Sequence, residues 1–183
     1  MTKVFLVYGH YNDKSFNAAI KDTFIKTAEE NNHKVDCVDL YKEKFNPVFA
    51  GEEPSSDVLD HRKRIEQCEV IALVAPIWNF RMPAILEGWI DKVLAPPWAF
   101  SFKKLFGNYG YPIGNLKGKK AIVFCTYGSP QFAIRTFFLN IFRDWDPSFA
   151  FVMVGALVIS TPMFHLFKNK SKPLFSSNFS ILF

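Results

Sequence analysis

Short apolar runs alternate along the chain with segments in which apolar residues recur every three or four positions. A short continuous run is typical of a strand buried on both faces of a parallel sheet, and the periodic segments are typical of helices that cover such a sheet. The alternation predicts strand–helix–strand units and therefore an α/β fold. The expected strands cover residues 3–8, 34–40, 69–75, 120–126 and 149–159, and the expected helices cover about residues 16–31, 57–67, 83–94 and 131–143.

Three segments do not follow this alternation. Residues 41–56 are rich in proline, glycine and glutamate, which predicts an irregular excursion. Residues 95–118 carry many aromatic residues among four glycines, which predicts a long loop, and such loops in compact domains are usually functional. Beyond residue 160 lysine, serine and asparagine are mixed with isolated apolar residues. We therefore expect one α/β domain over residues 1–160 and an irregular or poorly ordered tail over residues 161–183.

One uncharged stretch raises the question of a membrane span. Residues 147–167 contain no Asp, Glu, Lys or Arg, but their densely apolar part is only about a dozen residues long, whereas a helix needs roughly 20 to cross a bilayer. A buried terminal strand explains the stretch better. The chain starts with a strand pattern rather than the apolar segment of a signal peptide, and its three cysteines are widely spaced. These features predict a cytoplasmic protein.

Charge adds little to this prediction. The 183 residues are enough for one domain and carry a formal net charge of +5, but the lysines and arginines are scattered along the chain. We therefore do not expect a nucleic-acid partner. A weakly basic surface would still attract a phosphorylated nucleotide.

Several common catalytic patterns are missing from the sequence. It has neither the GxGxxG nor the GxxxxGK[ST] loop of common nucleotide-binding folds, and its four histidines show no HExxH or paired spacing. Residues 127–130 lack the GxSxG frame of a serine hydrolase. The sequence therefore predicts no metal site and no nucleophilic serine.

Three loops follow expected parallel strands at their carboxyl ends, and such ends lie at one edge of a doubly wound sheet. The loop of residues 9–17 leads into a helix N-terminus, where free N–H groups and the positive end of the helix dipole favour a phosphate. The loops of residues 76–83 and 126–130 offer aromatic faces and amides. A planar ligand with polar edges, such as an isoalloxazine ring, fits this combination.

Each of these assignments has a simpler structural alternative. Ser15 can be only the N-cap of the helix that follows, because its hydroxyl can accept a hydrogen bond from a free N–H of the first turn. Trp78 and Phe80 can be core residues rather than walls for a ring. The residues themselves leave these alternatives open.

Four motifs resemble those of a known family. They read VYGHYNDKSFNAAI, DLYKEKFNPVF, APIWNFRMPAILEGWIDKVLAPPWAF and GKKAIVFCTYGSP. Over residues 3–145 the chain resembles the flavodoxin-like NAD(P)H:quinone oxidoreductases, which include mammalian quinone reductase and the bacterial ancillary oxidoreductases of potassium efflux systems. The resemblance implies a flavodoxin-like, doubly wound sheet of five parallel strands in the order 2-1-3-4-5 with helices on both faces. It also implies bound FMN or FAD and a homodimer with the active site at the subunit interface.

The resemblance also implies roles for individual residues. Tyr127 is the candidate for a catalytic role. The third loop reads CTYGS where the mammalian members read TTGG, and the C-terminal region does not match the family's final helix. The candidate cofactor-binding residues are His10, Ser15, Phe16 and Asn17 in the first loop, Pro76, Ile77, Trp78, Asn79 and Phe80 in the second, and Thr126, Tyr127, Gly128 and Ser129 in the third.

These implied features lead to one main hypothesis and two alternatives. The main hypothesis is an FMN-dependent enzyme that takes a hydride from NADH or NADPH onto flavin N5 and then reduces a quinone in the same pocket. A related enzyme would reduce an azo or nitroaromatic acceptor. The second alternative is a non-enzymatic flavin-binding subunit that regulates a membrane transporter. The short chain favours FMN over FAD.

Overall fold

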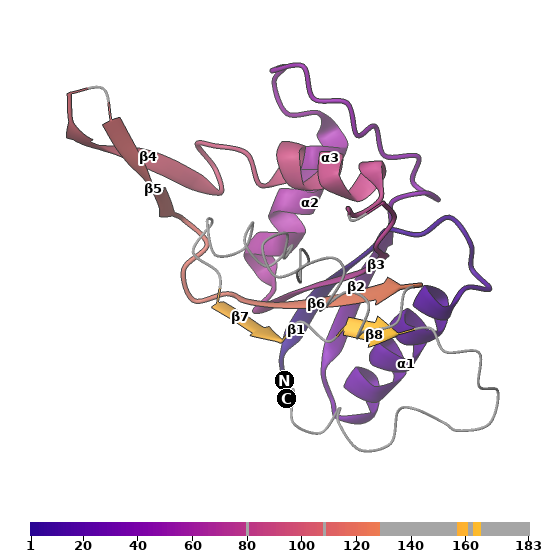
Figure 1. Ribbon diagram of the computed structural model, residues 1–183. Helices are drawn as coiled ribbons and strands as arrows, with labels where there is room; N and C mark the ends of the chain where they lie inside the picture. Colours follow the sequence, from indigo (N-terminus) through magenta and orange to yellow (C-terminus); the bar gives the residue numbers. More distant parts are fainter. Residues whose placement is uncertain (80, 108, 129–156, 161–162, 166–183) are drawn as a thin grey trace, which may run out of the picture.

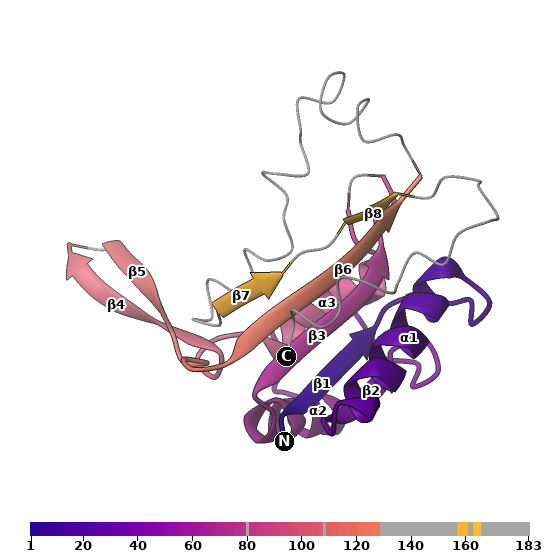
Figure 2. The same cartoon turned by 90° about the horizontal axis from the view of Figure 1, so that it is seen from below.

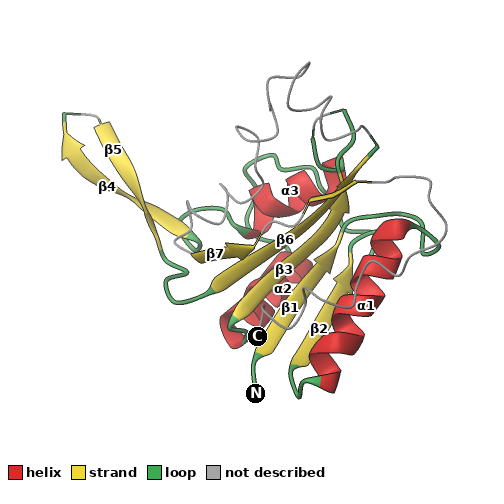
Figure 3. Cartoon of the chain, turned by 60° about the horizontal axis from the view of Figure 1, so that its bottom comes forward, coloured by secondary structure: helices red, strands yellow, loops and turns green. Residues whose placement is uncertain are grey.

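A computed structural model describes residues 1–79, 81–107, 109–128, 157–160 and 163–165. Figures 1 and 3 show a twisted sheet with α1 on one face and α2 and α3 on the other. This layered arrangement is the α/β fold that the hydrophobic pattern predicts. The elements are β1 (Lys3–Tyr8), α1 (Phe16–Glu30), β2 (Lys34–Asp39), α2 (Ser56–Gln67), β3 (Val70–Pro76), α3 (Ala84–Val93), β4 (Phe100–Phe106), β5 (Tyr109–Gly114), β6 (Lys120–Tyr127), β7 (Leu157–Ser160) and β8 (Met163–His165).

Four long strands form the parallel part of the sheet in the order β2-β1-β3-β6. Beyond β6, the short strands β7 and β8 both pair with it in parallel. A fifth parallel strand over residues 149–159 was expected, which would complete the order 2-1-3-4-5. The four long strands follow the first part of that order, but beyond them the described residues form only the two short strands β7 and β8. Residues 149–156 of the expected fifth strand lie outside the described part.

The core is divided by the sheet into two halves. Along β1, Phe5 and Val7 pack with the residues of α2 and α3, whereas Val4 and Leu6 pack with α1. Successive side chains of a strand point to opposite faces, so a strand with a layer on each side is apolar throughout. Every residue of β3 is buried for this reason. The sheet therefore positions its carboxyl edge on a rigid base.

Helix α1 begins where the sequence predicts it. The Ser15 hydroxyl accepts a hydrogen bond from the Ala18 N–H at 3.1 Å, which confirms it as the N-cap. The buried side chains of the apolar stripe include Ile20, Phe24 and Ala28, and they cover one face of the sheet. The loop before Ser15 is consequently held at the carboxyl edge of β1.

Helix α3 differs from its prediction at the first residue. Pro83 was expected to be the first helical residue, but it precedes the helix as the N-cap residue, and α3 begins at Ala84. Element ends shift by a residue or two because the chain enters a helix gradually. Within the helix, Gly88 lies against Pro47 so closely that an added β-carbon would be 2.6 Å from the Pro47 α-carbon. The irregular excursion after β2 is thus packed directly on α3.

The prediction of a long loop over residues 95–118 is wrong for the central residues of that range. Strands β4 and β5 pair there as an antiparallel hairpin, which projects away from the sheet and helices (Figures 1 and 2). Its aromatic and glycine content suggested a loop, whereas the alternation of Phe100 and Phe102 with polar residues is a strand pattern. The hairpin exposes Phe102, Leu105, Phe106 and Tyr109 at 64–71% of their surface.

Some expectations fall outside the described residues. The helix expected over residues 131–143 and most of the tail expected over residues 161–183 are among them, so the boundary at residue 160 stays a prediction. Strand β8 lies inside the segment expected to be a tail. In the described part of the chain, no helix combines the length and the apolar composition that a membrane crossing requires.

Candidate functional site

The three loops predicted to form a site do meet at the carboxyl edge of the sheet. The Asn17 side-chain amide donates to the Thr126 hydroxyl at 3.0 Å, and both residues are buried. The Ile77 N–H donates to the Thr126 carbonyl at 2.7 Å, and the Gly9 N–H donates to the Val74 carbonyl at 2.9 Å. Hydrogen bonds therefore join the first loop to the third and the second loop to the third.

The first loop is shaped by its own polar groups. The Asn12 N–H donates to His10 Nδ1 at 3.0 Å, and the Lys14 N–H donates to the Asn12 side chain at 2.8 Å. The Tyr8 hydroxyl lies 3.1 Å from the Ser15 hydroxyl. Burial raises the pKa of Tyr8 above its ordinary value, so the hydroxyl keeps its proton. The loop arrives at the N-terminus of α1 in a defined conformation.

His10 contributes a buried ring nitrogen to this loop. The side chain is 9% exposed. Nδ1 lies 3.0 Å from the Asn12 nitrogen and 3.3 Å from the Asn12 carbonyl oxygen. When Nδ1 accepts from the Asn12 N–H, the shorter of the two contacts, Nε2 carries the proton of the neutral ring. The structure gives that Nε2 no partner within the described residues. A ring N–H next to a helix N-terminus fits an anionic ligand group.

Aromatic rings surround the first two loops. The His10 ring stacks on Tyr11 with centroids 4.8 Å apart, and Trp78 lies 5.6 Å from His10 and 6.0 Å from Tyr11. Tyr41 meets Tyr11 edge-on at 6.2 Å. Trp78 is 40% exposed, so its alternative role as a core residue is wrong. Tyr11 and Tyr41 were not among the residues expected at the site, although they lie inside the motifs VYGHYNDKSFNAAI and DLYKEKFNPVF.

The second loop turns sharply. Trp78 and Arg81 exchange backbone hydrogen bonds of 2.8 and 2.9 Å, and Asn79 between them has a left-handed φ of 49°. Asparagine tolerates this conformation better than most residues. Arg81 donates to both carboxylate oxygens of Glu87 in α3 at 2.7–3.0 Å. Pro76, expected to be the first loop residue, is the last residue of β3; Ile77 packs on the core, and Phe80 lies outside the described residues.

The third loop is described only at its start. Thr126 and Tyr127 are buried at the end of β6. A β-carbon added to Gly128 would meet no atom within 4 Å, so the backbone there borders open space. Ser129 lies outside the described residues. Phe16 opens α1 directly behind the cap. The described part of the chain holds no group of three or more His, Cys, Asp or Glu side chains placed to bind a metal.

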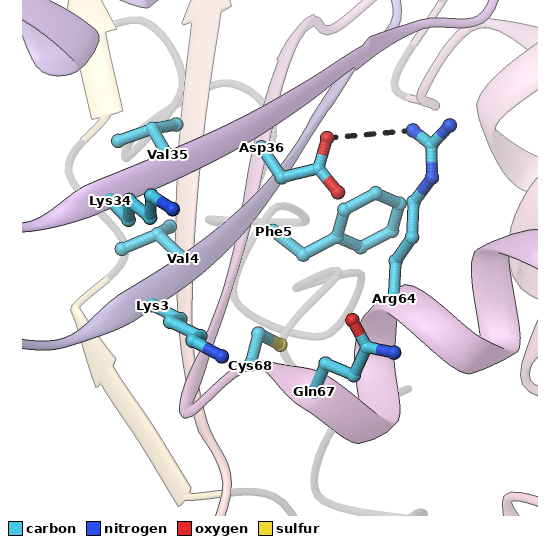
Figure 4. Close-up of a pocket in the computed structure, with 9 residues that line it drawn as sticks. All are labelled: Lys3, Val4, Phe5, Lys34, Val35, Asp36, Arg64, Gln67 and Cys68. Carbon is cyan, nitrogen blue, oxygen red and sulfur yellow. Dashed lines mark ion pairs between the residues drawn. The ribbon is translucent and has the colours of Figure 1, made fainter.

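Two cavities lie away from these loops. One of about 290 Å³ lies at the amino ends of β1 and β2 (Figure 4). Lys3 and Lys34 line it, and Arg64 forms a 3.6 Å ion pair with Asp36 across it. The other, of about 550 Å³, lies beside α2 and α3. Neither of these two cavities contains a residue of the three loops.

A known protein family shares this architecture. The family described as having a flavodoxin-like fold matches residues 2–143. The chain belongs to this flavodoxin-like family. Ligands of such sheets bind outside the carboxyl ends of the strands, where the three loops of this flavodoxin-like chain meet.

Curated relatives are similar over part of their length. The chain is 26% identical over 151 residues to the mouse protein named ribosyldihydronicotinamide dehydrogenase [quinone], with 69% of the chain and 63% of the relative covered. It is 32% identical over 133 residues to an uncharacterized NAD(P)H oxidoreductase of Haemophilus influenzae, with 68% of the chain and 63% of the relative covered. The chain therefore spans less than two thirds of the length of these relatives.

Solved structures share the fold over most of the chain. Smu.1420 from Streptococcus mutans matches with a TM-score of 0.75 and 28% identity, covering 89% of the chain and 87% of the neighbour. The FMN-dependent NADH-azoreductase from Bacillus anthracis, solved with FMN, matches with a TM-score of 0.68 and 16% identity, covering 90% and 87%. The second match bears on the fold only.

Proposed function

We propose that this flavodoxin-like chain is an FMN-dependent oxidoreductase that passes a hydride from NAD(P)H to a quinone. The observation that carries the proposal is the junction of three loops. The buried Asn17–Thr126 hydrogen bond joins the start of α1 to the third loop, and the Ile77–Thr126 bond joins the third loop to the second, which carries the exposed Trp78. Names of relatives support the chemistry, since one is a quinone-dependent dehydrogenase and another an NAD(P)H oxidoreductase. When bound, the flavin supplies the hydride chemistry, and the protein supplies position and electrostatics.

The first loop would hold the phosphate of FMN. Free N–H groups of the first turn of α1 and the positive end of its dipole favour an anion. The His10 Nε2–H can donate to this phosphate, and Lys14 adds positive charge. Ser15 already caps the helix, and its hydroxyl can still donate its own proton to a phosphate oxygen.

The second and third loops would hold the ring. Trp78 offers a flat apolar face, and Asn79 offers a side-chain amide at the tip of a tight turn. The backbone at Gly128 borders open space, so its N–H can approach a polar ring edge. Phe80 and Ser129 are proposed to join them on the evidence of their motifs only. Tyr127 is buried, and a catalytic role for it stays a prediction.

A quinone is the proposed acceptor, and an azo compound is the second candidate. The exposed rings of Tyr11 and Trp78 can accommodate either planar acceptor. A structural neighbour is named as an azoreductase. A regulatory role beside a membrane transporter stays a prediction that no reported relative's name mentions. Cytoplasmic location and the choice of FMN over FAD also stay proposals.

A flavin titration tests the proposal. The purified chain incubated with FMN is expected to give a bound-flavin absorption spectrum and to oxidise NADH or NADPH with menadione as acceptor. Trp78→Ala should weaken FMN binding by about tenfold, because an aromatic contact contributes on the order of 1 kcal/mol. Leu59→Ala is the matched control, since Leu59 is also exposed but lies on α2.

The outcomes separate the competing roles. A chain that stays colourless with both FMN and FAD contradicts the quinone reductase, the azo reductase and the flavin-binding accessory role alike. A flavin-loaded protein without NAD(P)H oxidation supports the transporter accessory role instead. Reduction of an azo dye with no turnover of menadione favours the second enzyme candidate.

We further propose that the active form is a homodimer in which the β4–β5 hairpin contacts the second copy. An isolated two-stranded hairpin is marginally stable in water, and this one exposes several large apolar side chains. Phe102→Asp is expected to leave the far-UV circular dichroism spectrum unchanged, since Phe102 is 64% exposed within one chain and surface changes usually cost under about 0.5 kcal/mol. Sedimentation velocity should show a shift to monomer. Lys104→Ala on the same hairpin is the control, and equal dimer fractions in both variants would contradict the proposal.

A further inference from the structure

The larger cavity beside α2 and α3 is lined by flat apolar walls and by charges. It measures about 550 Å³, within the range of roughly 300–1,000 Å³ typical of small-molecule sites. Its charged residues are Arg62, Lys92, Glu52 and Glu53. Its apolar walls include Phe49, Pro54, Val58, Pro96, Pro97 and Trp98. A ligand here would need both a flat apolar body and a charged group.

Arg62 is the exceptional residue of this cavity. It is 8% exposed, and its Nε and Nη2 donate to the carbonyls of Val93 and Lys92 at 3.0 Å each. A guanidinium has five N–H donors, so three remain. Within the described residues no carboxylate lies within ion-pair distance of Arg62. Burial lowers the pKa of Arg62, yet arginine stays charged in proteins. The cavity therefore contains a buried charge with unused donors.

Lys92, by contrast, is already satisfied. Its ammonium lies 3.0 Å from a Glu52 carboxylate oxygen and donates to the Val48 carbonyl at 3.0 Å. Hydrogen bonds from the backbone N–H of Glu52 itself, from Lys92 and from the Ala50 N–H lower the pKa of Glu52 to about 2. The Glu52 carboxylate is therefore already paired with the Lys92 ammonium. Glu53 remains as the one further carboxylate among the lining residues.

The rings near Arg62 add a surface for a planar ligand. The guanidinium carbon lies 5.1 Å from the Trp98 ring centroid, and the Trp98 N–H donates to Glu66 at 3.0 Å, which fixes the indole. Pro96 and Pro97 line the cavity next to it. Rigid aromatic and proline surfaces lose little entropy when they contact a ring.

We propose that this cavity binds a planar aromatic carboxylate, whose two oxygens accept from the unused N–H groups of Arg62 while its ring packs against Trp98 and Pro97. The planar fork of arginine matches a carboxylate with two parallel hydrogen bonds. A doubly charged phosphate fits less well, because Glu52 and Glu53 also line the cavity. No residue of the three loops lines it, so the inference does not rest on the proposed oxidoreductase function.

Calorimetric titration with 2-naphthoate tests the proposal on the purified chain, with and without saturating FMN. Arg62→Met should weaken binding about tenfold or more, as expected when a charge-assisted pair is lost. Arg64→Met is the matched control, since Arg64 lies on the same helix but pairs with Asp60 at 2.8 Å and lines the other cavity. The neutral 2-naphthamide should bind more weakly than 2-naphthoate by a similar factor.

Arg62→Met also removes the hydrogen bonds to the Lys92 and Val93 carbonyls at the end of α3, and it can unfold the protein. A second variant therefore keeps the test decisive. Glu53→Gln removes a competing carboxylate from an exposed residue, and it should tighten 2-naphthoate binding about two- to threefold. Titration of this variant with 2-naphthoate should shift the indole N–H resonance of Trp98. Absence of saturable binding, unchanged affinity in both variants, or competition between 2-naphthoate and FMN would each overturn the proposal.

Discussion

Replacing Gly88 with alanine is expected to destabilise the protein by about 2–3 kcal/mol, the range of overpacking in a tight contact. Alanine normally stabilises a helix interior relative to glycine by about 0.5–1 kcal/mol. At this position the added β-carbon would lie 2.6 Å from the Pro47 α-carbon and closer still to its carbonyl oxygen. Both are backbone atoms, so a rotamer change cannot relieve the clash.

Urea unfolding and calorimetry would measure the effect. For a domain of this size, a loss of 1 kcal/mol lowers the melting temperature by about 2–4 °C, so a decrease of about 5–10 °C is expected. Gly110→Ala is the control, because its β-carbon would meet its nearest atom at an ordinary 3.4 Å. A Gly88→Ala variant as stable as the original chain would mean that the excursion after β2 does not pack on α3.

The second large effect is expected at the hydrogen bond that joins the first and third loops. Thr126→Val keeps the shape of Thr126 but leaves the buried Asn17 amide without its partner, at a cost of about 1–3 kcal/mol. Asn17→Leu should cost a similar amount for the reciprocal reason. The double variant should cost less than the sum of the two, because two apolar groups then face each other.

A double-mutant cycle in urea, combined with FMN titration, would measure both the stability and the binding. Thr126→Ser retains the hydroxyl and serves as the control for loss of the methyl group. Each single variant should weaken FMN binding in addition to lowering stability, since the bond positions two of the proposed binding loops. Strict additivity of the two substitutions would show that Asn17 and Thr126 do not interact in solution.

Elements with a strong local pattern were predictable from the sequence. The continuous apolar run of β3 and the Ser15 cap of α1 both lie as expected, because burial on two faces and a local side-chain bond leave clear signals in adjacent residues. The hairpin of β4 and β5 was not predicted. Among the described strands, β4 and β5 pair only with each other, and they lack the apolar runs that identify the strands of the main sheet.

The geometry of the candidate site was predictable only in part. The convergence of the three loops follows from a general rule about parallel sheets. The exposure of Trp78 and its approach to Tyr11 depend on contacts between separate loops, which periodicity does not report. The contact of Gly88 with Pro47 also joins residues from different elements. A single sequence carries no direct signal for such pairs.

The Asn17–Thr126 bond also bears on the order in which the protein folds. These residues are 109 positions apart, and a contact that closes so long a segment forms late, since the loss of chain entropy precedes the gain from the contact. The first and second strands can pair before residue 126 has been synthesised, but the bond cannot form until β6 has docked beside β3. A nascent chain would therefore bring the first and third loops together only after most of its sheet has assembled.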